Sequence, residues 1–244
     1  MLAGDFPRNS AARAPDRVAL IGRGQRLTYA QFDEQANRLA NALLDLGLRK
    51  GAKVAILSTN RPEYAIAYFG IARTPYVSVH CSTRSTADEL LYVLNKTEAE
   101  LLFLENRFVP LIEAVLSELD KPTKLIVFGR PQDQTAELAD DMYFDQMLRD
   151  KSAAPPDVSL DENDPLAITL TGGTTGLPKA VLVSHRSRCA SAIAAAVARS
   201  VLLAATTTHG APPMSRWAMP WSPGPIPLDA SITNSTPSPS SSEP

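Results

Sequence analysis

The most informative stretch of the chain reads Leu166-Ala167-Ile168-Thr169-Leu170-Thr171-Gly172-Gly173-Thr174-Thr175-Gly176-Leu177-Pro178-Lys179. Its first five residues are typical of a short apolar strand, and three glycines and three threonines follow within six residues. Glycine allows close backbone approach and positive φ, so consecutive N–H groups can form a concavity that binds anions. Threonine hydroxyls add donors, and the Lys179 ammonium adds charge for phosphate oxygens. The pattern predicts a loop that wraps a polyphosphate; a polar surface hairpin is the alternative.

This loop differs from a Walker A loop, in which glycine directly precedes the lysine and Ser or Thr follows it. Here Leu177 and Pro178 separate Gly176 from Lys179, and Ala180 follows the lysine. Any phosphate binding must therefore use another motif.

Upstream of the loop, strand-like runs alternate with helices that have recognisable ends. Helix starts are predicted at Thr28, with Gln31 as capping-box partner, at Asn60-Arg61-Pro62-Glu63, and at Thr86 with Glu89. Strands are predicted at Arg17–Ile21, Lys53–Leu57, Tyr76–Val79, Glu100–Leu104, Lys124–Phe128 and Ala167–Leu170. This alternation predicts an α/β fold with a mostly parallel sheet covered by helices. Residues 130–163 are polar and are expected to form a loop.

The run from Thr171 to Lys179, continued by Ala180-Val181-Leu182-Val183-Ser184-His185-Arg186, resembles the signature loop of the AMP-forming adenylating enzymes. That superfamily contains acyl-CoA synthetases, the adenylation domains of nonribosomal peptide synthetases, and luciferases. Gly172 replaces the family's usual serine and Ala180 its usual glycine. Both changes keep the other glycines, the threonines and the lysine that would bind phosphate.

The resemblance covers about residues 7–200 and implies an incomplete N-terminal part of the large domain of these enzymes. Its upstream matches are Ala14-Pro15-Asp16-Arg17-Val18-Ala19-Leu20, Leu27-Thr28-Tyr29-Ala30-Gln31-Phe32, Gly51-Ala52-Lys53-Val54-Ala55-Ile56-Leu57 and Asn60-Arg61-Pro62-Glu63-Tyr64. The segment Ile71-Ala72-Arg73-Thr74-Pro75-Tyr76 departs from the family's Leu-Lys-Ala-Gly-like pattern, which puts the local turn geometry in doubt.

The resemblance implies an acyl-CoA synthetase-like ligase, such as those of fatty acid metabolism, that uses ATP, Mg²⁺ and coenzyme A. A small-molecule carboxylate attacks the α-phosphorus of ATP, and a thiol then displaces AMP from the acyl-adenylate. The cofactor-binding residues carried over are Thr171, Gly172, Gly173, Thr174, Thr175, Gly176 and Lys179. His209-Gly210 falls roughly where the family has a histidine and glycine near the acyl pocket, so His209 is a candidate remnant of that site.

Several later motifs of the family do not occur in the chain. These are the aromatic-Gly-x-Thr-Glu and Thr-Gly-Asp motifs, the hinge and the small C-terminal domain with its catalytic lysine. Because these parts hold adenine, ribose and Mg²⁺, we expect weak ATP binding and no activity from this chain alone. Three interpretations stay open: a ligase represented by its N-terminal part, a non-catalytic fragment, and part of a peptide-synthetase adenylation domain.

Residues 201–244 differ in composition from the rest of the chain. They contain three charged side chains and 9 of the 20 prolines, which is typical of disorder. We expect a partial AMP-binding domain over residues 7–200 and an irregular, low-charge Pro/Ser/Thr-rich tail over residues 201–244, the change that a truncation or frameshift would produce.

The overall composition narrows the partners and the compartment. A net charge of -2 gives no reason to expect nucleic acid, and no stretch has the length and apolarity of a membrane span. Cys81 and Cys189 do not form a disulfide framework, so we expect a cytoplasmic protein. His80 and Cys81 are adjacent on a predicted strand and would point to opposite faces, so a buried cysteine is favoured over a catalytic pair.

Overall fold

The computed structural model describes residues 1–129, 143–171 and 178–208, with side chains up to residue 197. The chain divides into two compact units, Met1–Ala194 and Ala195–Pro244, and the architecture below is that of the first. Its helices are η1 (Ala3–Asp5), α1 (Phe6–Arg13), α2 (Tyr29–Asp45), α3 (Pro62–Ile71), α4 (Ala87–Thr97), η2 (Asn106–Phe108), α5 (Val109–Glu113), η3 (Leu116–Glu118), α6 (Phe144–Leu148) and the start of α7 (His185–Thr208). Its strands are β1 (Val18–Gly22), β2 (Gln25–Thr28), β3 (Lys53–Leu57), β4 (Val77–His80), β5 (Ala99–Glu105), β6 (Lys124–Phe128), β7 (Pro165–Thr171) and β8 (Lys179–Ser184).

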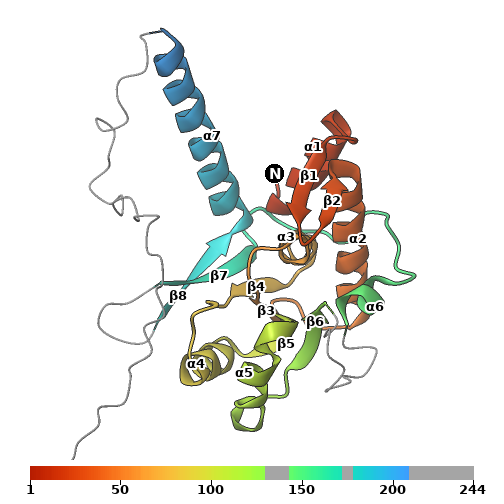
Figure 1. Cartoon of the computed structure of the whole chain (residues 1–244), viewed down its shortest axis with the longest axis vertical. Helices are drawn as coiled ribbons and strands as arrows, with labels where there is room; N and C mark the ends of the chain where they lie inside the picture. Colours follow the sequence, from red (N-terminus) through yellow and green to blue (C-terminus); the bar gives the residue numbers. More distant parts are fainter. Residues whose placement is uncertain (130–142, 172–177, 209–244) are drawn as a thin grey trace, which may run out of the picture. The chain divides into compact units, whose positions relative to one another are not determined.

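Within the described residues, six strands form the main sheet, in the order β6-β5-β3-β4-β7-β8 (Figure 1). Every neighbouring pair from β6 to β7 is parallel, and only β7 and β8 are antiparallel. The predicted mostly parallel α/β sheet is therefore confirmed. β1 and β2 form a separate antiparallel hairpin.

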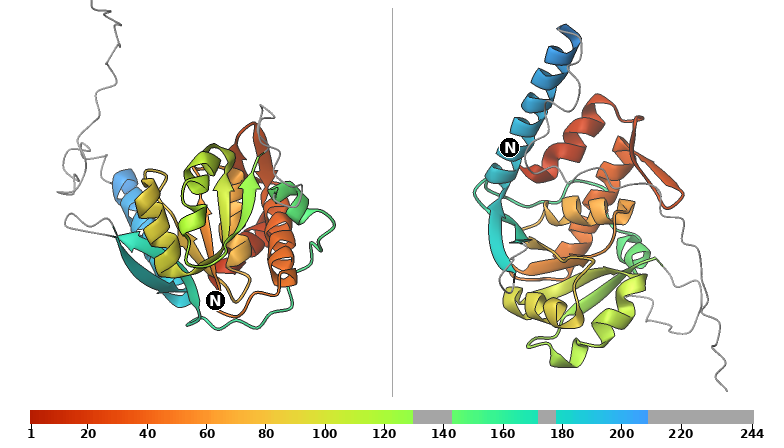
Figure 2. Two further views of the ribbon diagram at one scale, coloured as in Figure 1. Left: turned by 90° about the horizontal axis from the view of Figure 1, so that it is seen from below. Right: turned by 60° about the vertical axis from the view of Figure 1, so that its left-hand side comes forward.

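Helices cover both faces of the sheet (Figure 2). On one face, α2, α3 and α6 pack over alternate residues of β3 and β5, such as Val54, Ile56 and Phe103. On the other face, α4 and α5 pack over the residues between them, such as Ala55 and Leu102. A strand that is buried on both faces has no polar alternation, and this is why the parallel strands form continuous apolar runs in the sequence.

The helix starts follow the local signals in the sequence. Thr28 and Thr86 each accept a hydrogen bond from the backbone N–H three residues on, and the side chains of Gln31 and Glu89 return the bond. α2 ends just before Gly47, whose φ of 66° is the left-handed conformation that commonly follows a helix. Both predicted capping boxes are confirmed.

The structure differs from expectation in three places. α6 lies within residues 130–163, because Phe144 and Leu148 bury their side chains against the sheet despite their polar neighbours. β2 pairs with β1, an element that the sequence signals did not indicate. The backbone of α7 continues to Thr208, eight residues into the segment predicted as a tail; residues 209–244 lie outside the described part of the chain.

Candidate functional site

The carboxyl ends of the parallel strands gather polar side chains at one edge of the sheet. β3 is followed by Ser58 and Thr59, β4 by the loop 81–86, and β7 ends at Thr171. β5 ends at Glu105 on the same edge. In open α/β sheets this edge is where ligands bind, at points where adjacent strands lead to opposite faces. The predicted phosphate loop begins at this edge.

The two ends of that loop are held together by the β7–β8 hairpin. Thr171 and Lys179 face each other in the register, and the Thr171 hydroxyl donates to the Lys179 carbonyl oxygen at 3.3 Å. Of the seven predicted cofactor-binding residues, the structure describes these two. Gly172, Gly173, Thr174, Thr175 and Gly176 lie outside the described residues, as does His209.

A cavity of about 400 Å³ lies between the start of β4's loop and the end of β7. Thr171 and Pro178 line one side of it, and Ser82, Arg84 and Ser85 line the other. Hydroxyls and a guanidinium are suitable donors for phosphate oxygens. The sequence analysis missed these three residues, although their place directly after a predicted parallel strand was a usable signal.

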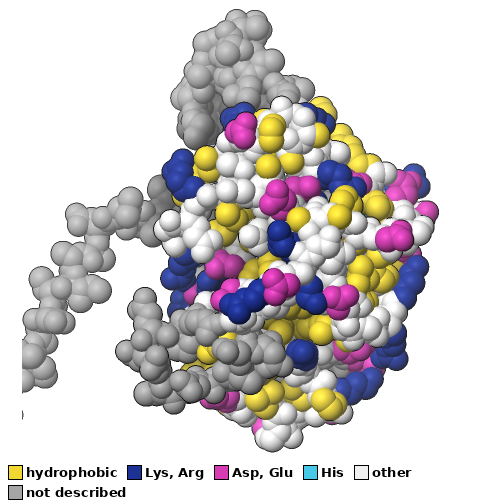
Figure 3. Space-filling model, turned by 90° about the vertical axis from the view of Figure 1, so that its right-hand side faces the viewer, with side chains coloured by type: hydrophobic (Ala, Val, Ile, Leu, Met, Phe, Trp, Pro, Cys, Tyr) yellow, Lys and Arg dark blue, Asp and Glu magenta, His cyan; other side chains and the backbone are white. Residues whose placement is uncertain are grey.

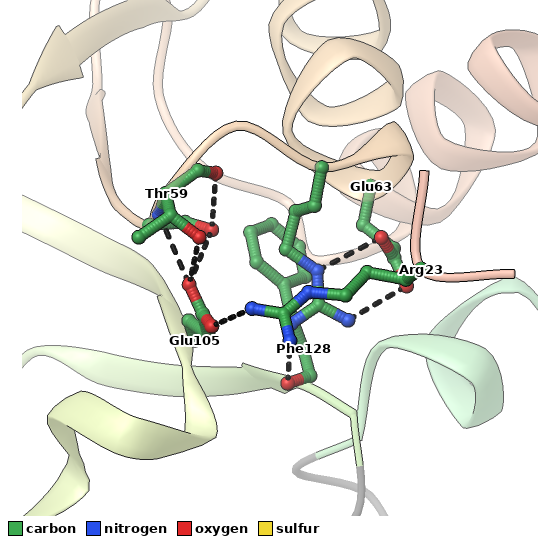
Figure 4. A network of polar contacts seen from close by, with 7 residues as sticks. Arg23, Thr59, Glu63, Glu105 and Phe128 are labelled. Carbon is green, nitrogen blue, oxygen red and sulfur yellow. Dashed lines mark hydrogen bonds and ion pairs between the residues drawn. The ribbon is translucent and has the colours of Figure 1, made fainter. Parts of the chain in front are cut away.

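A second polar cluster ties β3 to β5 at the same edge, as Figure 4 shows. The Glu105 carboxylate, 2% exposed, accepts hydrogen bonds from the Thr59 hydroxyl at 2.6 Å and from the Thr59 backbone N–H at 3.0 Å. Arg23, at the tip of the β1–β2 hairpin, reaches its other oxygen at 2.7 Å. Burial alone would raise the pKa of Glu105, but the hydrogen bonds from Thr59 and the charge of Arg23 outweigh it, so the pKa is lowered. Glu105 is thus an ionised, fully partnered group.

Arg61 connects the same cluster to β6. It forms two 2.8 Å hydrogen bonds with Glu63, and its guanidinium lies over the Phe128 ring and donates to the Phe128 carbonyl oxygen. The bidentate geometry fixes the loop that leads into α3. This cluster links the ends of β3, β5 and β6, and its charges pair as Arg23 with Glu105 and Arg61 with Glu63.

The histidine and cysteine pair at the end of β4 is not a catalytic dyad. Cys81 is buried among apolar side chains, and burial raises the pKa of its thiol to about 12. The His80 ring instead contacts Tyr64 and Ser78, on the other face of the sheet. The prediction of a buried, unreactive cysteine agrees with this arrangement.

Three further observations concern metal, membrane and nucleic-acid binding by the part of the chain that the structure describes. No group of three His, Cys, Asp or Glu side chains there could hold a metal ion. No described helix is both long and apolar enough to cross a bilayer. Acidic and basic side chains are intermixed across the face in Figure 3, so that face presents no patch of one sign for nucleic acid.

Two known proteins with sequences similar to this chain are CoA ligases. A medium/long-chain-fatty-acid–CoA/3-oxocholest-4-en-26-oate–CoA ligase of Mycolicibacterium smegmatis is 34% identical over 181 residues, which are 74% of this chain and 33% of that protein. A 3-hydroxybenzoate–CoA/4-hydroxybenzoate–CoA ligase of Thauera aromatica is 31% identical over 172 residues, 70% of this chain and 32% of that protein. The chain thus spans about a third of the length of these relatives.

Solved structures give the same result for the fold. The anthranilate CoA ligase AuaEII in complex with anthranoyl-AMP matches 76% of this chain and 35% of its own, with a TM-score of 0.69 and 25% identity. The fatty acyl CoA synthetase of Mycobacterium tuberculosis matches 75% of this chain and 34% of its own, with a TM-score of 0.62 and 28% identity. The AMP-binding enzyme family matches residues 7–218. The chain therefore belongs to the AMP-binding enzyme family, of which it represents the N-terminal part.

Proposed function

We propose that residues 171–179 bind the phosphates of ATP, as the nucleotide-binding part of an AMP-forming ligase that activates a small-molecule carboxylate. One observation supports this above the others: the β7–β8 hairpin brings Thr171 and Lys179 together at the carboxyl edge of the sheet, beside a cavity that contains Arg84. Arg84 and several hydroxyls line this cavity, and Lys179 follows Pro178 on its wall. The Glu89 carboxylate also lines it but accepts a hydrogen bond from the Thr86 backbone N–H. These cations and hydroxyls suit a polyanion.

The proposed activation has two chemical steps. A carboxylate oxygen attacks the α-phosphorus, the bond from that phosphorus to the bridging oxygen breaks, and pyrophosphate leaves. A thiol sulfur then attacks the acyl carbon of the adenylate, the bond from that carbon to the phosphate oxygen breaks, and AMP and the thiol proton leave. Lys179 and Arg84 would act in the first step, by neutralising charge that moves onto the pyrophosphate. Mg²⁺ is implied by the family, but the described residues offer it no ligand set, so no step here is assigned to it.

We propose that a thiol accepts the acyl group. The relatives include CoA ligases and a fatty acid–[acyl-carrier-protein] ligase, ScoC of Streptomyces coeruleorubidus, which is 34% identical over 177 residues. Coenzyme A is the acceptor that we propose for this chain, in a cytoplasmic setting.

Titration of ATP into the purified chain tests the nucleotide-binding role. We expect weak binding that Lys179→Ala lowers by about tenfold, because one charge-assisted contact to phosphate is lost. Lys96→Ala, which removes an exposed lysine on α4, is the matched control and should leave binding unchanged. Equal ATP affinity in all three proteins would contradict the assignment.

Pyrophosphate release with ATP and a panel of carboxylates then tests catalysis separately. Release that depends on both a carboxylate and Lys179 would assign the first step to this chain. ATP binding without release would leave it a nucleotide-binding part with no activity of its own.

A further inference from the structure

The first residues of the chain pack against the start of α7. The Ala3 backbone N–H donates to the ring Nδ1 of His185 at 3.2 Å. Both residues are enclosed, because Ala3 has no exposed surface and His185 is 1% exposed. Ala3 also packs with Leu166 of β7 and Cys189 of α7 in one buried cluster. In this docked state, the start of the chain is joined to the residue that directly follows β8.

The hydrogen bond between Ala3 and His185 requires a neutral ring. Nδ1 can accept only when it carries no proton, so the single proton of the neutral ring lies on Nε2. A protonated ring carries a proton on each nitrogen, and its Nδ1–H would then face the Ala3 N–H. Two donors that face each other in a buried space lose their bond and leave both hydrogens without an acceptor. The docked state therefore disfavours the protonated ring.

The surroundings of His185 act on its charge in both directions. Burial is the largest effect and lowers the pKa of His185, and the amino group of Met1 adds to this direction. The carboxylates of Asp164, just before β7, and Asp5, on η1, act against it but do not outweigh burial. A backbone N–H and the Lys50 ammonium lower the pKa of Asp164, so this carboxylate stays ionised in mild acid.

The other polar contacts of the first residues do not weaken in mild acid. Arg73 Nε donates to the Gly4 carbonyl oxygen at 2.9 Å, and an arginine stays charged at any such pH. The Met1 amino group lies 3.6 Å from the Glu162 carboxylate, and acidification completes the protonation of the amine. A glutamate loses its charge only near about pH 4. The histidine is thus the group in this set whose protonation opposes docking.

His80 also lies near the first residues, because it lines the same cavity as Ala3. Its ring nitrogens contact the Tyr64 hydroxyl at 2.6 Å and the Ser78 hydroxyl at 3.3 Å. Neither of these partners belongs to the start of the chain. Release of the first residues therefore leaves both contacts of His80 in place.

We propose that His185 is a pH-sensitive latch, which holds residues 1–5 against β7 and α7 at neutral pH and releases them in mild acid. In the released state the ring contacts water and takes up a proton at about pH 6.5, as an ordinary histidine does. The docked state excludes that proton, so its stabilisation is complete above about pH 6.5 and declines below it. Linkage lowers the ratio of docked to released chain by about tenfold between about pH 7.5 and about pH 5.5.

Hydrogen exchange of the Ala3 backbone amide, followed by NMR in the full chain, tests the latch. The protection factor is the ratio of the intrinsic to the measured exchange rate, so it removes the direct effect of pH on the exchange chemistry. We expect this factor to fall about tenfold from about pH 7.5 to about pH 5.5. It should stay below that of the Val54 amide at both pH values, because release of residues 1–5 is local and β3 lies inside the sheet.

Substitutions assign the effect to one ring. In His185→Asn, the side-chain oxygen can accept the Ala3 hydrogen bond in place of Nδ1 but cannot take up a proton. The protection factor of Ala3 should then be equal at the two pH values. His185→Ala removes the acceptor, so Ala3 should be less protected at neutral pH and should again show no dependence on pH. His80→Gln is the matched control and should keep the tenfold change.

Three results would overturn the proposal: equal protection of Ala3 at the two pH values in the unaltered chain, a tenfold change that persists in His185→Asn, or a change that disappears in His80→Gln. The first result comes from the unaltered protein, so it does not depend on how any variant folds. No nucleotide is present in these measurements, so their outcome is independent of the phosphate-binding role proposed for residues 171–179.

Discussion

At the scale of single residues, the molecule places one buried carboxylate at the end of a strand. Glu105 is an example, because its carboxylate is 2% exposed and yet ionised. Thr59 contributes both a hydroxyl and a backbone N–H to it, so most of the stabilisation comes from a short loop next to the site. Arg23 adds a positive charge from the protein surface, where its side chain is 54% exposed.

Glu105→Gln should therefore lower the free energy of unfolding by about 2 kcal/mol, because a buried charge-assisted cluster loses its acceptor. Arg23→Gln should cost less than about 1 kcal/mol, because an exposed partner in an ion pair contributes little. Urea unfolding at neutral pH measures both. A larger loss for Arg23→Gln than for Glu105→Gln would refute this ranking.

His80 links stability to pH through the same edge of the sheet. Its pKa is about 4 in the folded chain and near 6.5 when unfolded, so the unfolded chain takes up the proton first. The stabilisation from neutral His80 is complete above about pH 6.5 and is lost as the pH falls toward 4, by about 3 kcal/mol in total. Urea unfolding at pH 7 and pH 5 measures the change.

His80→Gln is the comparison for that measurement, because glutamine cannot take up the proton. Other groups, including His185, titrate equally in both proteins and cancel. The difference in unfolding free energy between pH 7 and pH 5 should be smaller in the variant. Identical differences would show that His80 does not cause the effect.

At the scale of elements, α2 and α3 approach closely because one of them carries glycine at the contact. A Cβ atom at Gly70 would lie 2.7 Å from the side chain of Leu39, which is fully buried in α2. The helices use this space to cover the same face of the sheet, and both contribute to one apolar cluster.

Gly70→Ala should destabilise the fold by about 1 to 3 kcal/mol, because the added methyl group overpacks this contact despite alanine's better helix propensity. Leu39→Ala in the same chain removes Cγ and Cδ2, two of the three Leu39 atoms that the methyl group would meet, and leaves Cβ at 2.9 Å. The double variant should thus be more stable than the sum of the single effects predicts, by thermal or urea unfolding. If the two single effects on the free energy of unfolding simply add, the added methyl group does not clash with Leu39.

Features that depend on residues close together in the sequence could be predicted. Contacts between residues far apart in the sequence could not. The capping boxes at Thr28 and Thr86 lie within four residues and could be identified directly. The pairing of Arg23 with Glu105 joins positions 82 apart, and the Tyr68–Arg188 pair depends on where α7 begins. Periodicity contains no information about such contacts. The phosphate loop stays a prediction over residues 172–177, which lie outside the described structure.

At the scale of the whole molecule, the sheet has an apolar edge. Among the described strands, β8 has a neighbour on one side only, and Val181 and Leu182 on it are 46% and 60% exposed. Unpaired edges with apolar side chains favour association between chains.

Leu182→Lys should therefore reduce self-association, because a lysine on an edge strand opposes pairing with a second edge. Light scattering across a concentration series measures it. Leu116→Lys, at an exposed position on η3 away from any strand, is the control and should change nothing. Equal effects of the two substitutions would mean that added charge alone, and not the edge, controls solubility.

The contacts of the first residues with α7 set an order of events during synthesis. The Ala3 backbone N–H donates to His185 Nδ1 across 182 positions, and Ala3 shares a buried cluster with Leu166 and Cys189. A ribosome delivers residue 3 first and residue 189 much later, so the start of the chain can contact Ala72 and Arg73 early but lacks its partners on β7 and α7 for most of translation. The sheet from β3 to β6 can assemble meanwhile from elements close in sequence. We therefore expect the N-terminal residues to complete their contacts only after α7 has left the ribosome.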